Sequence, residues 1–192
     1  MNGDPKGNRM GRDFSISCGK ELILRPLRLK DARAFFRLTE ANRERLRKWL
    51  PWVDDVLTID HTQAFIELAK EQAKRRQGLH CGIWWKGEPI GVVGFNTFDR
   101  MNRLGAIGYW IAEHAEGNGL VTRAVKALVK YGFEEEGLHR IEIRVAVRNR
   151  RSRAIPERLG FRHEGTLRGV ENLYGRFMDH AVYGMLTEDW GG

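Results

Sequence analysis

Residues 109–124 have the sequence YWIAEHAEGNGLVTRA, in which the end of an apolar strand, a glycine-rich turn and the start of a helix follow one another. Gly117 and Gly119 allow the backbone of the turn to come close to a ligand. The N–H groups of the first helical turn, with the helix dipole behind them, suit a pyrophosphate. A bare G-x-G pattern is more often only a tight connection, so the turn alone indicates an anion-binding site without establishing it.

Two better-known nucleotide-binding motifs do not fit this turn. A Rossmann fingerprint requires a third glycine where this chain has Thr122, and an acidic residue about 20 residues further on, where Leu138 and His139 lie. The lysine of a P-loop is absent as well. The pattern that remains is a phosphate-bearing cofactor bound at a turn that follows an antiparallel strand.

The residues around the turn predict a mixed α/β protein with a largely antiparallel sheet. Upstream, apolar residues at 22–27 form a first strand, and helical spacing follows over 31–50 and 60–78. From residue 79 the apolar period changes to two, which predicts a meander of strands at 79–85, 90–98 and 104–111. Downstream we expect a helix at 120–137, a strand at 139–147, a short helix at 152–159 and strands near 161–167 and 179–186.

The length of 192 residues fits one domain, and 42% hydrophobic residues are enough for its core. We expect a flexible arm at residues 1–19 and a single domain at residues 20–190. No apolar stretch approaches the roughly 18 to 20 residues of a membrane span, and the start lacks the apolar core of a signal peptide. These features predict a soluble, cytoplasmic protein without a membrane partner.

The net charge of +8 attracts nucleic acids, polyphosphate cofactors and acidic proteins without choosing among them. Cys18 and Cys81 cannot form a disulfide framework, and neither has the spacing of a metal ligand. We therefore expect no metal. Five histidines also lack metal spacing and are assigned surface or structural roles: His61, His80, His139, His163 and His180.

Several short motifs, taken together, are far more specific than the glycine turn. They are Trp49-Leu50-Pro51-Trp52, residues 90–95 (IGVVGF), residues 107–111 (IGYWI), Gly117-Asn118-Gly119, residues 149–152 (NRRS), residues 158–161 (RLGF) and Glu164-Gly165. With these motifs the chain resembles, from about residue 20 to 187, the GNAT superfamily of acyl-CoA-dependent N-acetyltransferases. The details are similar to the RimJ/RimL type, which acetylates the N-termini of ribosomal proteins.

The resemblance implies a GNAT fold, in which a mixed, mostly antiparallel sheet of about seven strands has helices on both faces. Two central parallel strands would splay apart into a V-shaped opening for acetyl-CoA, the cosubstrate, with no metal. Backbone groups of Trp110, Ile111 and Ala112 would bind the pantetheine arm, and Asn149 would hold it. The pyrophosphate would lie on the N–H groups of Gly117, Asn118, Gly119, Leu120 and Val121, with a hydroxyl donated by Thr122.

The resemblance also suggests two catalytic residues. Ser152, near the thioester sulfur, would donate a proton to the thiolate, and Glu171 would draw a proton from the amine through water. As plain alternatives, Asn149 and Ser152 could only begin a helix, and Glu171 could be a loop carboxylate. Many relatives have a glutamate where this chain has Ala106, so a carboxylate on that strand is missing.

The missing carboxylate bears on the acceptor. An α-amine with a pKa near 8 needs about 1 kcal/mol to become neutral at pH 7, whereas a lysine amine with a pKa near 10.4 needs about 4.6 kcal/mol. A weak or water-relayed base suffices for the first, which favours a protein N-terminus, such as a ribosomal one, over lysine side chains. Trp49, Trp52 and Asn96 are expected to line the acceptor cleft, although either tryptophan could equally be core.

Three further expectations concern partners. A small amine, such as an antibiotic or a polyamine, is an alternative acceptor, and a non-catalytic acyl-CoA-binding or ribosome-binding module is an alternative function. The arginines between Arg140 and Arg153 could form a nucleic-acid patch. Alternation places Arg140 and Arg144 on a solvated strand face, and the others lie near the expected cofactor, so nucleic acid is not the expected partner. Family members often pair, which suggests a homodimer.

Overall fold

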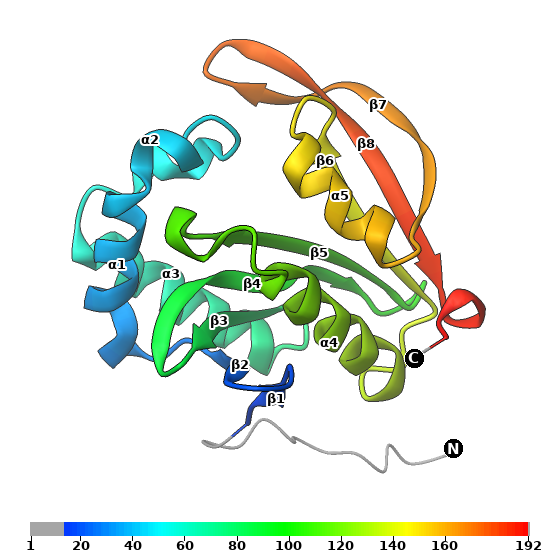
Figure 1. The fold of residues 1–192 in the computed structure, drawn as a ribbon, viewed down its shortest axis with the longest axis horizontal. Helices are drawn as coiled ribbons and strands as arrows, with labels where there is room; N and C mark the ends of the chain where they lie inside the picture. The colour runs from blue at the N-terminus through cyan, green and yellow to red at the C-terminus, as the bar shows by residue number, and fades with distance from the viewer. Residues whose placement is uncertain (1–13, 192) are drawn as a thin grey trace.

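The fold, given by a computed structural model that describes residues 14–191, is built around one eight-stranded sheet (Figure 1). The strands are β1 (Ile16–Ser17), β2 (Leu22–Pro26), β3 (Leu79–Trp85), β4 (Glu88–Asp99), β5 (Leu104–Ile111), β6 (Arg140–Ala146), β7 (Arg162–Leu173) and β8 (Arg176–Leu186). Their order is β1-β2-β3-β4-β5-β6-β8-β7, and among these strands only the β5–β6 pair is parallel. The expected mixed α/β class and the antiparallel meander β3-β4-β5 are confirmed.

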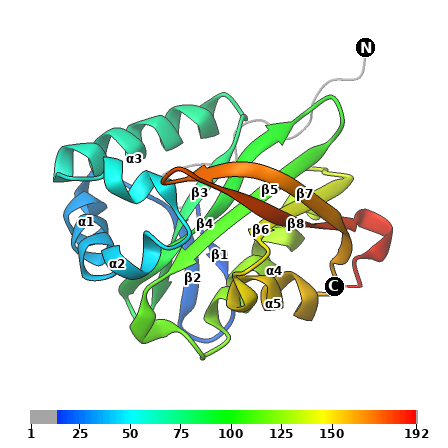
Figure 2. The same cartoon turned by 90° about the horizontal axis from the view of Figure 1, so that it is seen from above.

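Helices cover both faces of the sheet (Figures 1 and 2). The helices are α1 (Ala32–Ala41), α2 (Arg43–Leu46), α3 (Ile59–Lys74), α4 (Leu120–Glu134) and α5 (Arg150–Arg158), with 3-10 turns η1 (Leu29–Asp31), η2 (Pro51–Asp55), η3 (Glu113–Ala115) and η4 (Thr187–Asp189). Helices α4 and α5 pack on the face that holds Ile107 and Ile143, whereas α1 and α3 pack on the face that holds Val92 and Trp110. No helix among residues 14–191 is long and apolar enough to cross a membrane.

Two segments differ from the expectation. Residues 14–19 are expected to be part of a flexible arm but contain strand β1, in which Ile16 pairs with Leu24 of β2. This strand brings the sheet to eight strands instead of the expected seven or so. Residues 1–13 of that arm lie outside the described residues. Strands β7 and β8 form one long hairpin, so residues 168–173 belong to a strand rather than a loop. Composition alone missed both because polar residues on an edge strand or a protruding hairpin resemble a loop.

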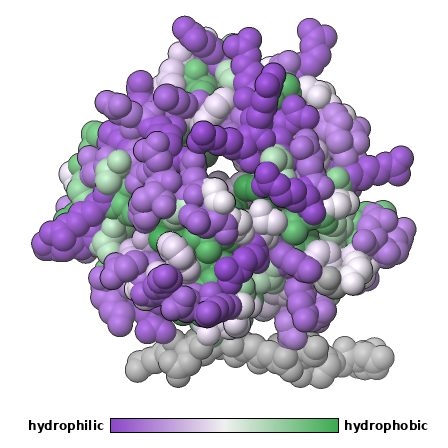
Figure 3. Space-filling model, in the orientation of Figure 1, coloured by the Kyte–Doolittle hydropathy of each residue, from purple (hydrophilic) through white to green (hydrophobic). Residues whose placement is uncertain are grey.

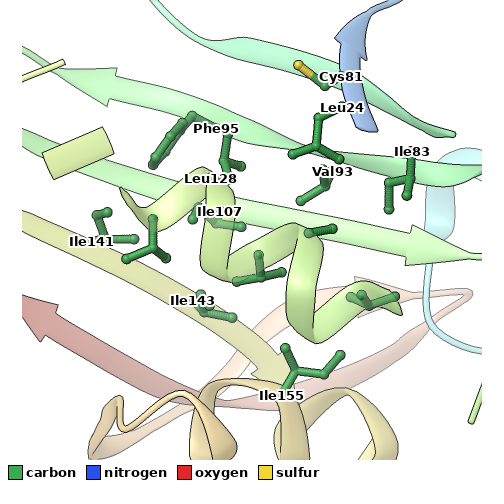
Figure 4. Close-up of a cluster of buried hydrophobic side chains, with 14 of the residues drawn as sticks. Leu24, Cys81, Ile83, Val93, Phe95, Ile107, Leu128, Ile141, Ile143 and Ile155 are labelled. Atoms are coloured by element: carbon green, nitrogen blue, oxygen red, sulfur yellow. The ribbon is translucent and has the colours of Figure 1, made fainter. Parts of the chain in front are cut away.

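The core is densest where α4 crosses the sheet (Figure 4). Leu128 of α4 lies against Ile107 of β5 and Ile141 of β6, within one cluster of buried side chains. Phe95 of β4 is fully buried, and its ring fills the space beside Gly105 and Gly132, where an added Cβ would stand 2.7 Å from it. The small residues therefore let the helix approach the sheet around one aromatic ring.

The two parallel strands separate soon after they meet. Strand β5 pairs with β6 only from Leu104 to Ile107. Beyond that point β5 continues beside β4 as far as Ile111, while β6 continues beside β8 as far as Ala146. Strand β4 has a bulge between Phe95 and Thr97, opposite the place where β5 leaves β6, and such bulges increase local twist. The expected V-shaped opening is present.

We predict that Phe95→Ala lowers the free energy of unfolding by about 3–5 kcal/mol, because it removes a buried ring and leaves a cavity between the sheet and α4. Urea denaturation followed by circular dichroism measures this change. Met101→Ala, at a side chain that is 93% exposed, is the control and should change stability by less than about 0.5 kcal/mol. Equal effects of the two substitutions would contradict this account of the core.

Candidate active site

The glycine turn forms an open backbone cradle at one end of the opening. Gly117 and Gly119 have φ values of +78° and +68°, in the left-handed region that favours glycine. Nothing lies within 4 Å of the position that a Cβ would take at either residue. The Asn118 side chain donates to the Glu116 carbonyl at 3.0 Å, which holds the turn in this shape. A ligand can therefore reach the backbone of the turn directly.

Helix α4 begins at this turn with its N-terminus uncapped. Gly119 is the N-cap residue and has no side chain that could accept from the first-turn N–H groups, and the first turn contains no acidic residue. Leu120 and Val121 are buried in the core, which fixes the direction of these N–H groups, and Thr122 is half-buried. Unpaired N–H groups at the positive end of a 15-residue helix suit a diphosphate. The residues expected to bind pyrophosphate fit that group.

The edge of β5 that faces the opening offers fewer backbone groups than expected. The Ala112 N–H donates to the Ile90 carbonyl of β4 at 2.7 Å, so this amide is already bonded. The backbone N–H and C=O groups of successive strand residues point to opposite edges of the strand. Those of Trp110 therefore also point towards β4, whereas those of Tyr109 and Ile111 point towards the opening. The Ile111 carbonyl accepts from the Arg45 guanidinium. Of the three residues expected to bind pantetheine, Ile111 is the one whose backbone points into the opening.

Helix α5 begins on the other side of the opening with Asn149 and Ser152. Asn149 is its N-cap residue, and its Oδ1 accepts from the Ser152 N–H at 3.2 Å. The plain helix-start interpretation of these two residues is therefore correct as far as it goes. The Ser152 hydroxyl takes no part in this cap and instead donates to the Tyr109 hydroxyl at 3.3 Å.

Tyr109, in the motif at residues 107–111, is a site residue that the sequence does not indicate. Its hydroxyl donates to the Ser152 carbonyl at 2.9 Å, so it ties β5 to α5 across the opening. Burial raises the pKa of Tyr109 well above its usual range, and the hydrogen bond to Ser152 opposes this only in part. The phenol is therefore protonated at neutral pH. Alternation along residues 107–111 could have placed it on the face of α4, beside Ser152.

Aromatic side chains line the opposite face of the opening. The Trp52 ring lies 6.2 Å from the Trp110 ring, and Trp49 is half-buried nearby in sequence. Neither tryptophan of the WLPW motif is fully buried, so neither is an ordinary core residue. Asn96 stands in the β4 bulge with its side chain over Gly108, whose absent Cβ would lie 2.6 Å from the Asn96 amide. Trp52 and Asn96 thus flank β5 on the face of α1 and α3.

Glu171 lies on strand β7 rather than in a loop, so its loop interpretation is wrong. Its hydrogen-bond partner is not Ser152 but His180 of β8, with 3.1 Å between His180 Nε2 and Glu171 Oε2. The sequence predicts only a structural or surface role for His180 and does not predict this contact. The structure therefore brings Asn149 together with Ser152, and Trp52 together with Trp110, and gives Glu171 a partner that spacing did not indicate.

A carboxylate lies beside Ala106 on the neighbouring strand β6, at Glu142. Glu142 of β6 is the register partner of Ala106 and is buried. Arg140 and Arg144 both donate to Glu142, and Arg140 also pairs with Glu164. This strand face is therefore an ion-paired cluster rather than a solvated face, and Glu142 is engaged by two cations. It does not replace the missing glutamate as a proton acceptor.

The tip of the β7–β8 hairpin closes the opening on the side of α2. Tyr174 and Gly175, with φ of +54° and +80°, form a two-residue turn between paired Leu173 and Arg176. The Tyr174 hydroxyl donates to the Leu50 carbonyl at 3.4 Å, and the Arg47 guanidinium lies 4.2 Å from the centre of its ring. Figure 3 shows the surface hollowed in this region, between α2 and α5.

Glu116 links the glycine turn to both walls of the opening. It accepts from Arg45 of α2, and it accepts from Arg151 of α5 at 2.8 Å. Since the side chain of Arg151 is 86% exposed, that second link is held only by the ion pair. Five arginines in and around this region make internal ion pairs or hydrogen bonds: Arg45, Arg140, Arg144, Arg151 and Arg153.

Thiol and metal chemistry have no visible basis in the described part of the chain. Burial raises the pKa of Cys18 to about 11 and that of Cys81 to about 12, so both thiols are protonated at neutral pH and are poor nucleophiles. Within residues 14–191, no group of three or more His, Cys, Asp or Glu side chains is arranged to hold a metal ion.

Comparison with known proteins agrees with this geometry. The curated protein "Putative ribosomal N-acetyltransferase YdaF" of Bacillus subtilis (strain 168) is 34% identical over 180 residues, which are 93% of this chain and 98% of that protein. RimL, a ribosomal L7/L12 alpha-N-protein acetyltransferase solved with coenzyme A, has a TM-score of 0.89 at 25% identity and covers 92% of this chain and 99% of its own. The microcin C7 self-immunity acetyltransferase MccE, solved with acetyl-CoA and AMP, has a TM-score of 0.85 at 30% identity, with coverage of 88% and 94%.

A family model described as an acetyltransferase (GNAT) domain matches residues 21–162, which include strands β5 and β6, the glycine turn and the whole of α5. The chain therefore belongs to the GNAT family of acetyltransferases.

Proposed function

We propose that this acetyltransferase transfers an acetyl group from acetyl-CoA to the N-terminal α-amine of a protein, with a ribosomal protein as the favoured acceptor. The observation that carries the proposal is the β5–β6 opening, which has an uncapped helix N-terminus at one end and two hydroxyl groups on its wall. The names of YdaF and RimL, as ribosomal acetyltransferases, support the choice of acceptor. Such a role implies a cytoplasmic protein, and pairing into a homodimer stays a prediction.

In this mechanism, proton donation to the thiolate and proton removal from the amine take place on opposite faces of the sheet. Acetyl-CoA supplies an activated acyl thioester when it is bound. On the face of α4, the Ser152 hydroxyl donates its proton to the departing thiolate in place of the Tyr109 oxygen, and Asn149 fixes the backbone of Ser152. On the opposite face, Glu171 accepts a proton from the amine, directly or through one water. The main-chain groups of Ile111 point into the opening between the two faces.

An α-amine suits this arrangement better than a lysine. Ala106 places no carboxylate on β5, and its neighbour Glu142 is held by two arginines. The proton acceptor therefore stands on the hairpin, where Glu171 keeps part of its side chain exposed. An amine that needs about 1 kcal/mol to lose its proton at pH 7 reacts with such a base, whereas one that needs about 4.6 kcal/mol reacts poorly.

A small amine remains the second candidate acceptor. MccE, which matches this fold at 30% identity, is named as a microcin self-immunity enzyme rather than as a ribosomal one. The aromatic pair of Trp52 and Trp110 beside the opening would clamp a flat or aliphatic small molecule as readily as a peptide.

We predict that the purified protein releases coenzyme A thiol with acetyl-CoA and peptides that copy the N-termini of ribosomal proteins. The same peptides with an acetylated N-terminus and an internal lysine should be at least tenfold slower, because only the lysine amine remains. A polyamine and an aminoglycoside serve as the comparison acceptors. Equal rates on free and blocked peptides would overturn the α-amine proposal, and a preference for the small amines would select the second candidate.

We predict that Ser152→Ala lowers kcat by about 10²- to 10⁴-fold, the range expected for a lost general acid, while the Kd for coenzyme A changes less than threefold. Thiol release measures kcat, and isothermal titration calorimetry measures Kd. Ser17→Ala on β1, at an exposed serine, is the matched control and should behave like the unaltered protein. If Tyr109→Phe lowers kcat more than Ser152→Ala does, the phenol and not the serine is the proton donor.

A further inference from the structure

Strands β7 and β8 carry a large irregularity that brings one carboxylate to one imidazole. Leu167 pairs with His180, but the next pair along the hairpin is Glu171 with Met178. Residues 168–170 of β7 therefore stand opposite the single residue Asp179. In regular pairing Glu171 would face Arg176, two residues further from His180, which is about 7 Å along a strand.

The irregularity is fixed by its own hydrogen bonds. Gly169 has a φ of +58°, and its N–H donates to Asp179 Oδ1 at 2.8 Å. The Asp179 carbonyl in turn accepts from the Val147 N–H at 2.9 Å, just beyond the end of β6. One aspartate thus holds the shifted register and ties it to the strand that borders the opening. Bulges near active sites are known to re-aim a side chain in this way.

His180 is held on the same face as the acceptor-side aromatics. It pairs with Ala146, the last residue of β6, and its neighbour Ala181 points into the core beneath α4. Since successive strand residues point to opposite faces, the His180 ring lies on the other face, the one that holds Trp110. Its side chain is 14% exposed, whereas that of Glu171 is 29% exposed.

We propose that His180 is a positioning residue for Glu171, an inference that rests on the proposed function. A carboxylate can only accept, so the 3.1 Å contact requires a hydrogen on His180 Nε2. That bond occupies Oε2 and leaves Oε1 of Glu171 for the incoming amine or its water. The amine proton passes to Oε1 and later to solvent, and His180 keeps its own proton throughout. His180 increases the rate of the reaction by holding the Glu171 carboxylate in one orientation before the proton is transferred.

The test is a double-mutant cycle on thiol release with the preferred amine. His180→Leu should lower kcat about 10- to 100-fold, in line with the cost of a misplaced catalytic group, with little change in the KM for acetyl-CoA. His180→Gln, whose amide nitrogen can take the place of Nε2, should stay within about fivefold of the unaltered protein. In a Glu171→Gln background, His180→Leu should have no further effect, because it acts only through Glu171.

The matched control is His163→Leu on the same hairpin, a histidine whose ring contacts Tyr183 instead; its kcat should not change. Full activity of His180→Leu, or an undiminished loss in the Glu171→Gln background, overturns the positioning role.

Nitrogen NMR of the histidine rings gives a readout that does not depend on turnover. We expect His180 Nε2 to carry a hydrogen, and we expect its signal to shift in Glu171→Ala. A ring that is indifferent to Glu171 overturns the pair itself. If NMR shows the pair but the unaltered protein acetylates no amine, it is the proposed function that fails.

Discussion

The early separation of β5 from β6 is the constraint on which the site depends. These strands pair over Leu104–Ile107 and then follow different partners, β4 and β8. A strand edge left open in this way exposes backbone groups that must find other partners. Arg45 satisfies one of them at the Ile111 carbonyl. The rest of the exposed edge is available to an extended ligand with amide groups of its own, and the helix N-terminus of α4 lies where such a ligand would end.

Strand β5 also separates the side chains on the two faces of the sheet. Successive residues of β5 point to opposite faces, so Tyr109 joins Ser152 beneath α4 while Trp110 joins Trp52 on the side of α1 and α3. In the proposed mechanism, the hydroxyl donor to the thiolate and the carboxylate acceptor for the amine would therefore approach the opening from different faces of the sheet. A direct hydrogen bond between the proposed acid and base would then be prevented.

In the proposed mechanism, Glu171 on the hairpin supplies the carboxylate that position 106 lacks. Glu142 is close to that position but forms ion pairs with Arg140 and Arg144 of the same strand. Glu171 comes opposite Met178, two residues from His180, because residues 168–170 of β7 bulge out opposite Asp179, whose carboxylate accepts from the Gly169 N–H. The hairpin tip contacts the segment that follows α2, where the Tyr174 hydroxyl donates to the Leu50 carbonyl.

Local patterns in the sequence determined the meander, helix α4, the glycine turn and the N-cap at Asn149, because periodicity and turn chemistry act over a few residues. They also indicated Ser152, through its spacing from Asn149 and the family motif. They could not pair Glu171 with His180, or find Tyr109 beside Ser152 and Arg45 at Ile111. Those contacts join residues far apart on the chain, or depend on a two-residue register shift that polar hairpin residues do not reveal. Only the packed sheet, in which strand register and helix placement are fixed together, decides which side chains meet.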